Sequence, residues 1–111
     1  MTDREMLELA AKAAGYRVHG WLNDKLYVIN GPNPAEYYDP FPWNPLSDDG
    51  DALRLAVKLR LDIQLLDLGV VATNYKAPGR PYAVENYGED HCAATRRAIV
   101  RAAAEIGKHG A

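Results

Sequence analysis

The sequence predicts an α+β domain in which three helices flank a mainly antiparallel sheet of four to five strands, in the order α-ββ-α-ββ(β)-α. Apolar residues recur at helical spacing near both ends and in the middle of the chain, and pairs of short strand-like runs lie between these segments. The connections within each strand pair are short, which favours antiparallel pairing because parallel strands need a longer crossover. With 111 residues, the chain 1–111 has the length of a single domain with its own core.

The first predicted helix begins after Thr2, a good N-cap residue with Glu5 three positions later, which is the pattern of a capping box. Gly15 is expected to end this helix. The apolar residues between these two signals recur at helical spacing: Met6, Leu9, Ala10 and Ala13.

Two strands, 16–22 and 26–30, are predicted next, around a turn-rich centre at 23–25 that is typical of a hairpin. Both faces of the second strand are apolar, so we expect it to be covered on both sides. The residues concerned are Leu26 and Val28 on one face and Tyr27 and Ile29 on the other.

The segment 31–42, GPNPAEYYDPFP, holds four of the seven prolines and three aromatic residues. Proline lacks a backbone donor and restricts the residue before it, so we expect neither a helix nor a regular strand ladder here. The segment is nevertheless too aromatic for an inert linker.

A second helix is predicted from Ser47, a good N-cap residue, and acidic side chains in its first turns suit the helix dipole: Asp48, Asp49 and Asp51. Its buried stripe is expected to consist of Ala52, Leu55, Ala56 and Leu59, widened by Leu53 and Val57. The expected solvent-facing residues are Asp51, Arg54 and Lys58.

In the C-terminal half, strands are predicted at 63–68 and 70–75, broken near Gly69, with a third and less regular strand at 82–87. The last helix is expected to start near Glu89 or Asp90, to run to Ile106 and to be stopped by Gly107. Its predicted buried stripe consists of Ile99, Ala102, Ala103 and Ile106, with Thr95 extending it backward.

Composition and charge limit the classes of partner. The net charge is −2, which gives no whole-molecule electrostatic reason to expect nucleic acid or a membrane as partner. The one cysteine, Cys92, excludes an intramolecular disulfide and a multi-cysteine zinc site. Apolar runs are too short for a membrane span and the start of the chain is charged and amphipathic, so the expected location is the cytoplasm.

Three stretches carry a resemblance to a known family: Leu7 to Gly15, WNPLSDDGDALRLAVKL from Trp43 to Leu59, and ATRRAIVRAAAEIG from Ala94 to Gly107. Together they resemble the small bacteriophage and prophage proteins that contain a phage ABA sandwich domain. The resemblance covers most of the chain but is not specific over 65–89. It implies a phage-encoded accessory protein with helices flanking a sheet, in the cytoplasm of the host cell, and it assigns no catalytic residue.

No catalytic residue, metal ligand or cofactor site is predicted. The acids near Asp48 are explained by helix capping, and they lack the spaced ligands of a calcium loop. The histidines are scattered, without the spacing of a helical metal motif. His91 stands beside Cys92, but neighbouring residues seldom face each other on a helix, so we expect a small buried or half-buried cysteine.

Two groups of residues are candidates for binding. Aromatic side chains on a proline-stiffened loop have the character of interface anchors, and the candidates for partner binding are Tyr37, Tyr38, Phe41 and Trp43. The alternative for Trp43 is that it fills the core beneath the loop. Three guanidinium groups on the last helix are candidates for anion binding: Arg96, Arg97 and Arg101. Their alternative is a solvated face paired with nearby acids such as Glu105 or the acidic segment 31–52.

Three functional classes remain open. The leading class is a non-catalytic accessory protein that binds a host or phage protein, in counter-defence or host takeover, or that associates with itself. The second is a small-ligand module that sequesters a nucleotide-like anion, with aromatics for stacking and arginines for phosphate. A small enzyme ranks last, because the sequence presents no combination of nucleophile, acid and base.

Overall fold

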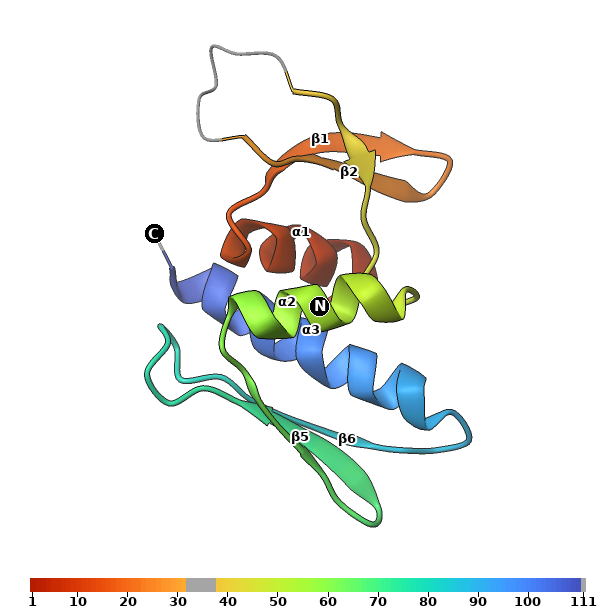
Figure 1. Cartoon of the computed structure of the whole chain (residues 1–111), viewed down its shortest axis with the longest axis vertical. Coiled ribbons are helices and arrows are strands. Elements are labelled where there is room, and N and C mark those ends of the chain that lie inside the picture. The colour runs from red at the N-terminus through yellow and green to blue at the C-terminus, as the bar shows by residue number, and fades with distance from the viewer. Residues whose placement is uncertain (32–37, 111) are drawn as a thin grey trace.

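A layer of helices lies between two antiparallel sheets (Figure 1). The structure, a computed structural model, describes residues 1–31 and 38–110. The helices are α1 (Asp3–Ala13), α2 (Asp49–Lys58) and α3 (His91–His109). Sheet A contains β1 (Arg17–Leu22), β2 (Lys25–Ile29) and β3 (Phe41–Pro42), and sheet B contains β4 (Asp62–Leu65), β5 (Gly69–Thr73) and β6 (Tyr82–Asn86).

The α+β class, the three helices and the antiparallel pairing are as predicted, but the expected single sheet of four to five strands is wrong. The described residues form six strands in two three-stranded sheets, in the order α-βββ-α-βββ-α. The helices do not flank one sheet, because the two sheets cover opposite sides of the helical layer (Figure 1). This arrangement follows from α3, which presents apolar residues on more than one side.

Helix α3 supplies both parts of the core. One side packs with α1, β2 and α2 through Ile99, Val100, Ala103 and Ala104. The other side packs against β5 and β6 through Ala94, Ala98 and Ala102. Thr95, expected to extend the buried stripe, is instead half-buried and donates its hydroxyl to the His91 carbonyl at 2.8 Å. The small alanine side chains allow the backbone of β5 and β6 to lie close to the helix.

Gly107 does not stop α3, which continues to His109. A Cβ atom at this position would lie 2.0 Å from the carbonyl oxygen of Leu9, which belongs to α1. The glycine is therefore a contact point between α1 and α3, where the two backbones approach more closely than any side chain would allow.

The starts of α1 and α3 agree with the predictions, with Asp90 capping α3, and the start of α2 differs by one residue. Thr2 caps α1 as predicted and accepts the Glu5 amide at 3.2 Å. The cap of α2 is Asp48 and not Ser47, with the Asp51 amide donating to its carboxylate at 2.8 Å. Asp51 in turn accepts from Arg54 at 2.8 Å, and this hydrogen bond raises the pKa of the guanidinium.

The buried side of α2 is narrower than predicted. Leu55 is buried and Leu59 is half-buried, but Leu53 and Val57 are 65% and 60% exposed and do not widen the stripe. The reason is that α2 contacts α3 along one side, whereas its far side has no covering element among the described residues.

Sheet A begins with the predicted hairpin, whose turn residues Asn23 and Asp24 both have positive φ. The expectation that β2 is covered on both sides is wrong. Leu26 and Val28 are almost fully buried against the helices, while Tyr27 and Ile29 on the other face are only half-buried. The outer face of sheet A is therefore only partly covered.

The end of the proline-rich segment does enter a strand ladder, contrary to prediction. Phe41 and Pro42 form β3 and pair with Val28 and Tyr27 of β2. Proline is tolerated because β3 is an edge strand of only two residues. The amide of Trp43 extends the contact by donating to the Leu26 carbonyl at 2.9 Å.

Sheet B has β5 at its centre, and all five residues of that strand are buried. The predicted third strand of this half is present as β6. The strand β4 ends earlier than predicted, because residues 66–68 connect β4 to β5 as a tight turn in which the Leu66 amide donates to the Gly69 carbonyl at 2.8 Å. The break lies at this turn and Gly69 itself begins β5, which ends at Thr73 and not at the predicted residue 75.

The close contact at Gly107 predicts the direction in which an alanine at this position changes the stability of the protein. In an exposed helix, glycine-to-alanine substitution stabilises by about 1 kcal/mol. We expect Gly107→Ala to lower the free energy of unfolding by about 1–3 kcal/mol instead, because the new methyl group overlaps the α1 backbone. Urea unfolding followed by circular dichroism measures the change, with the exposed neighbour substituted in Lys108→Ala as control. A Gly107→Ala protein as stable as the control would contradict the close approach of α1 and α3.

Candidate functional site

Two of the aromatic candidates for partner binding face inward. The rings of Phe41 and Trp43 lie edge-on to Tyr16, with centroid distances of 5.8 and 5.5 Å and interplanar angles of 84° and 85°. Trp43 is 4% exposed, so the alternative in which it fills the core is the one the structure shows. These side chains fasten the end of the proline-rich segment to the helical layer.

The other two aromatic candidates come earlier in the sequence of the segment. Tyr38 is half-buried, and a Cβ atom on Gly31 would lie 2.2 Å from two carbons of its ring. The absence of a side chain at Gly31 therefore lets the ring lie against the start of the segment. Tyr37 is outside the described residues.

Each of the three arginine candidates for anion binding already forms hydrogen bonds or ion pairs with carboxylates and carbonyls of the protein. Arg96 donates to Asp49 at 2.6 Å and to the Leu46 carbonyl at 2.8 Å. The guanidiniums of Arg97 and Arg101 both approach Glu85, the first with a nitrogen–oxygen distance of 3.8 Å. Two further contacts complete the set: Arg97 to Asp3 at 3.3 Å, and Arg101 to the Val84 carbonyl at 2.8 Å.

The arginines therefore follow the alternative reading, in which nearby acids pair with them. Arg96 uses an acid of the segment 31–52, as that alternative expected. Glu105, the other expected partner, lies instead 3.6 Å from His109. The carboxylates already neutralise the positive charge that an anion would need.

A hollow of about 440 Å³ lies on sheet A, between its first two strands and Pro40. We call it the sheet A hollow; its lining residues are His19, Gly20, Trp21, Leu22, Tyr27 and Pro40. Gly20 is paired with Tyr27 across the two strands, and a Cβ atom on Gly20 would meet nothing within 4 Å. The missing side chain thus leaves the neighbourhood of the Tyr27 ring uncovered.

Contacts to α1 hold one wall of the sheet A hollow. The indole Nε1 of Trp21 donates to Glu8 at 3.2 Å, and the guanidinium of Arg4 lies 4.4 Å from the centre of the Trp21 ring. Arg4 is itself paired with Asp24 at 2.8 Å. A side chain held in this way loses little conformational entropy when a partner binds to it.

The strands that form the sheet A hollow are basic. Arg17 and Lys25 are exposed, and β1 and β2 contain no aspartate or glutamate. Neither cation has an ion pair within the part of the chain that the structure describes, whereas the nearby acid of the turn, Asp24, is already paired with Arg4. Arg17 and Lys25 do not line the hollow itself, but they lie on the two strands that form it.

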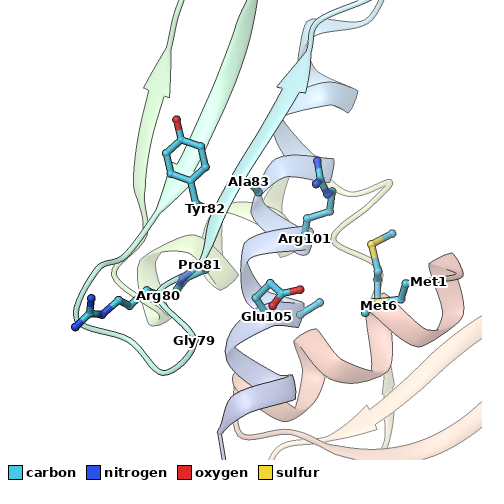
Figure 2. A pocket seen from close by; sticks show the side chains of 10 residues that line it. Met1, Met6, Gly79, Arg80, Pro81, Tyr82, Ala83, Arg101 and Glu105 are labelled. Atoms are coloured by element: carbon cyan, nitrogen blue, oxygen red, sulfur yellow. The ribbon is translucent and has the colours of Figure 1, made fainter.

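A second pocket, of about 450 Å³, lies between α1, α3 and the start of β6 (Figure 2). Arg101 and Glu105, one turn apart on α3, form its polar wall, and Met6 of α1 forms an apolar wall. Figure 2 shows the side chains of Arg80 and Tyr82 pointing away from α3. Arg101 is engaged with Glu85, so this pocket offers a carboxylate beside an already neutralised arginine.

The histidine and cysteine residues provide no catalytic arrangement. His91 stacks on Tyr87 with a centroid distance of 4.2 Å, and no group of three or more potential metal-ligating side chains comes together within residues 1–31 and 38–110. Cys92 is exposed, so the expectation of a buried or half-buried cysteine is wrong. It lies in the first turn of α3, before that helix enters the core.

The residues of the sheet A hollow were not predicted as a site. The available signal was Gly20 inside a strand pattern beside Trp21, since a glycine in a strand marks a bulge or an open place on the sheet. Recognising the hollow also required the pairing of Gly20 with Tyr27, which no periodicity reveals.

The inward position of Phe41 gives a stability test. We expect Phe41→Ser to lower the free energy of unfolding by roughly 1–3 kcal/mol, because it removes the ring that packs on Tyr16. Thermal and urea unfolding measure the loss. Leu53→Ala, at a leucine of α2 that is 65% exposed, is the control and is expected to unfold like the unsubstituted protein. Equal stability of the two variants would contradict the inward position of Phe41 and would make it a candidate for an exposed binding residue again.

None of the helices in the described part of the chain has the length and apolar character needed to cross a membrane. Comparison of the chain with protein families, curated proteins and solved structures finds no match in any of the three.

Proposed function

We propose that this chain is a non-catalytic accessory protein that acts by binding another protein, with the sheet A hollow as its contact surface. The resemblance to phage ABA sandwich proteins suggests a host or phage protein as the partner and the host cytoplasm as the place of action. The observation that supports the proposal is a preformed hollow on two strands that also carry two cations, Arg17 and Lys25, without an ion pair among the described residues.

The chemistry of this face favours a particular kind of partner. An apolar or aromatic side chain would enter beside Tyr27, where the absence of a side chain at Gly20 leaves room. Acidic residues on either side of that anchor would meet Arg17 and Lys25, because opposite charges across an interface steer association and fix its register. The partner we propose is therefore a protein segment with an apolar anchor flanked by aspartate or glutamate.

Two other classes have weaker support. Sequestering a nucleotide-like anion at α3 would require free guanidinium groups on that helix, and its three arginines are all engaged with carboxylates or carbonyls. An enzyme would require a nucleophile or a general base within reach of a substrate pocket. Among the described residues, the exposed Cys92 has no such partner, since the ring of its neighbour His91 stacks on Tyr87.

Selection from a random peptide display library tests the proposed partner chemistry. We expect the protein to enrich peptides that contain one apolar anchor with neighbouring acidic residues, and their binding to weaken as salt concentration rises because the charges are exposed. Lys25→Glu and Leu22→Ser should each reduce binding of the enriched peptides by about tenfold or more, a loss of about 1.4 kcal/mol, when measured by fluorescence anisotropy.

Matched controls lie on α2 and in the loop after β5. Leu53→Ser and Lys76→Glu change an exposed leucine and an exposed lysine outside the sheet A hollow, and both should bind the peptides like the unsubstituted protein. Enrichment of basic peptides, or equal losses in the controls and the test variants, would count against this surface.

A further inference from the structure

The free edge of β4 presents unpaired backbone groups. The Leu66 amide bonds to the Gly69 carbonyl, within sheet B, and bonding direction alternates along an antiparallel strand. The backbone groups of Gln64 and Asp62 therefore also point toward β5, and those of Ile63 and Leu65 point outward. No backbone hydrogen bond of the described residues engages Ile63 or Leu65 on that outer side.

The opposite edge of sheet B is not open in the same way. The amide of Tyr87 donates to the Leu68 carbonyl, so alternation directs the backbone groups of Val84 outward from β6. The outward carbonyl of Val84 accepts a hydrogen bond from Arg101 at 2.8 Å. A side chain of α3 thus occupies the edge at β6, while the edge at β4 has no comparable cover among the described residues.

The open edge is also apolar. Leu65 is 67% exposed, Leu66 is 53% exposed, and Leu68 in the following turn is 84% exposed. The strand β4 contains no lysine or proline, the residues with which natural edge strands avoid pairing with other chains. An edge with free donors, free acceptors and exposed leucines favours the addition of a further strand.

We propose that this edge pairs with the same edge of a second copy of the chain, antiparallel and across a two-fold axis at Gln64. In this register Ile63 lies opposite Leu65 of the second copy, so the outward backbone groups of both residues find partners in both copies. The two sheets B become one continuous six-stranded sheet, formed from two sheets of three strands each.

Charge at the two ends of β4 fits this register. The segment 58–61 before the strand carries Lys58 and Arg60 and no acid, and the turn 66–68 after it carries Asp67 and no base. Antiparallel pairing about Gln64 brings the segment 58–61 of each copy to the turn 66–68 of the other. Arg60 and Asp67 are both exposed, and neither has an ion pair among the described residues of its own chain.

A proline on the outward side of β4 tests the proposal. Leu65→Pro removes the outward N–H and leaves the bonds from β4 to β5 in place, so we expect it to abolish the dimer without unfolding the protein. Analytical ultracentrifugation should give twice the 12.3 kDa chain mass for the unsubstituted protein and the single-chain mass for the variant. Gln64→Pro is the contrast, because it removes an inward N–H and should lower the melting temperature.

Because proline could also disturb the fold, Leu65→Lys is the second variant. It keeps the backbone N–H of residue 65. A charged side chain on the edge should also yield the monomer. Its matched control is Leu22→Lys, at a leucine of sheet A with 60% exposure, which should leave the dimer intact.

A charge exchange tests the register. Arg60→Asp and Asp67→Arg should each weaken the dimer, and the double variant should restore it. Residues 60 and 67 are about 23 Å apart along an extended chain, so restoration requires a contact between two copies.

A single-chain mass throughout a concentration series of the unsubstituted protein would overturn the proposal. A dimer that survives both Leu65→Pro and Leu65→Lys would do so as well, because it would place the interface elsewhere. The inference does not rest on the proposed function: peptide binding at the sheet A hollow can fail while the dimer is found, and the reverse.

Discussion

The structure depends on how closely other elements can approach α3. Its buried positions are mostly alanine, and Ala98, Ala102 and Ala103 have no exposed surface. Small side chains let one helix serve two packing surfaces, with α1 and α2 on one side and β5 and β6 on the other. A sheet of three short strands is stable only when its apolar face is covered, so sheet B relies on this helix directly and sheet A relies on it through α1.

The charges on α3 fix the positions of the surrounding layers. Arg96 joins α3 to the start of α2 through Asp49, Arg97 reaches Asp3 at the start of α1, and Glu85 of β6 receives both Arg97 and Arg101. Exposed ion pairs contribute little free energy individually, so their effect is mainly on orientation. One of these pairs, Arg96 with Asp49, joins the basic end of the chain to the acidic segment 31–52, and the other arginines pair with acids outside that segment.

Local sequence patterns were sufficient to predict much of the fold but little of the candidate site. Helical spacing and capping residues predicted the three helices, since these signals act within a few residues of the chain. They could not show which strands share a sheet. Gly107 illustrates the limit, because a glycine at the end of an alanine-rich helix is typical both of a stop and of a close helix contact. Trp43 illustrates it for the site, because an aromatic residue beside prolines suits either an exposed anchor or a core plug, and only the contact with Tyr16 separates the two.

The two surfaces we propose lie on opposite sides of the helical layer, since the hollow belongs to sheet A and β4 belongs to sheet B (Figure 1). Pairing at β4 would therefore leave both hollows of a dimer open. A shallow hollow of this size with two cations supports only modest affinity by itself, because the buried area is small. Two such hollows on one rigid dimer would bind a target that presents its acidic segment more than once with greater avidity, without any new contact. Self-association at one sheet and partner binding at the other would then be complementary parts of the same activity.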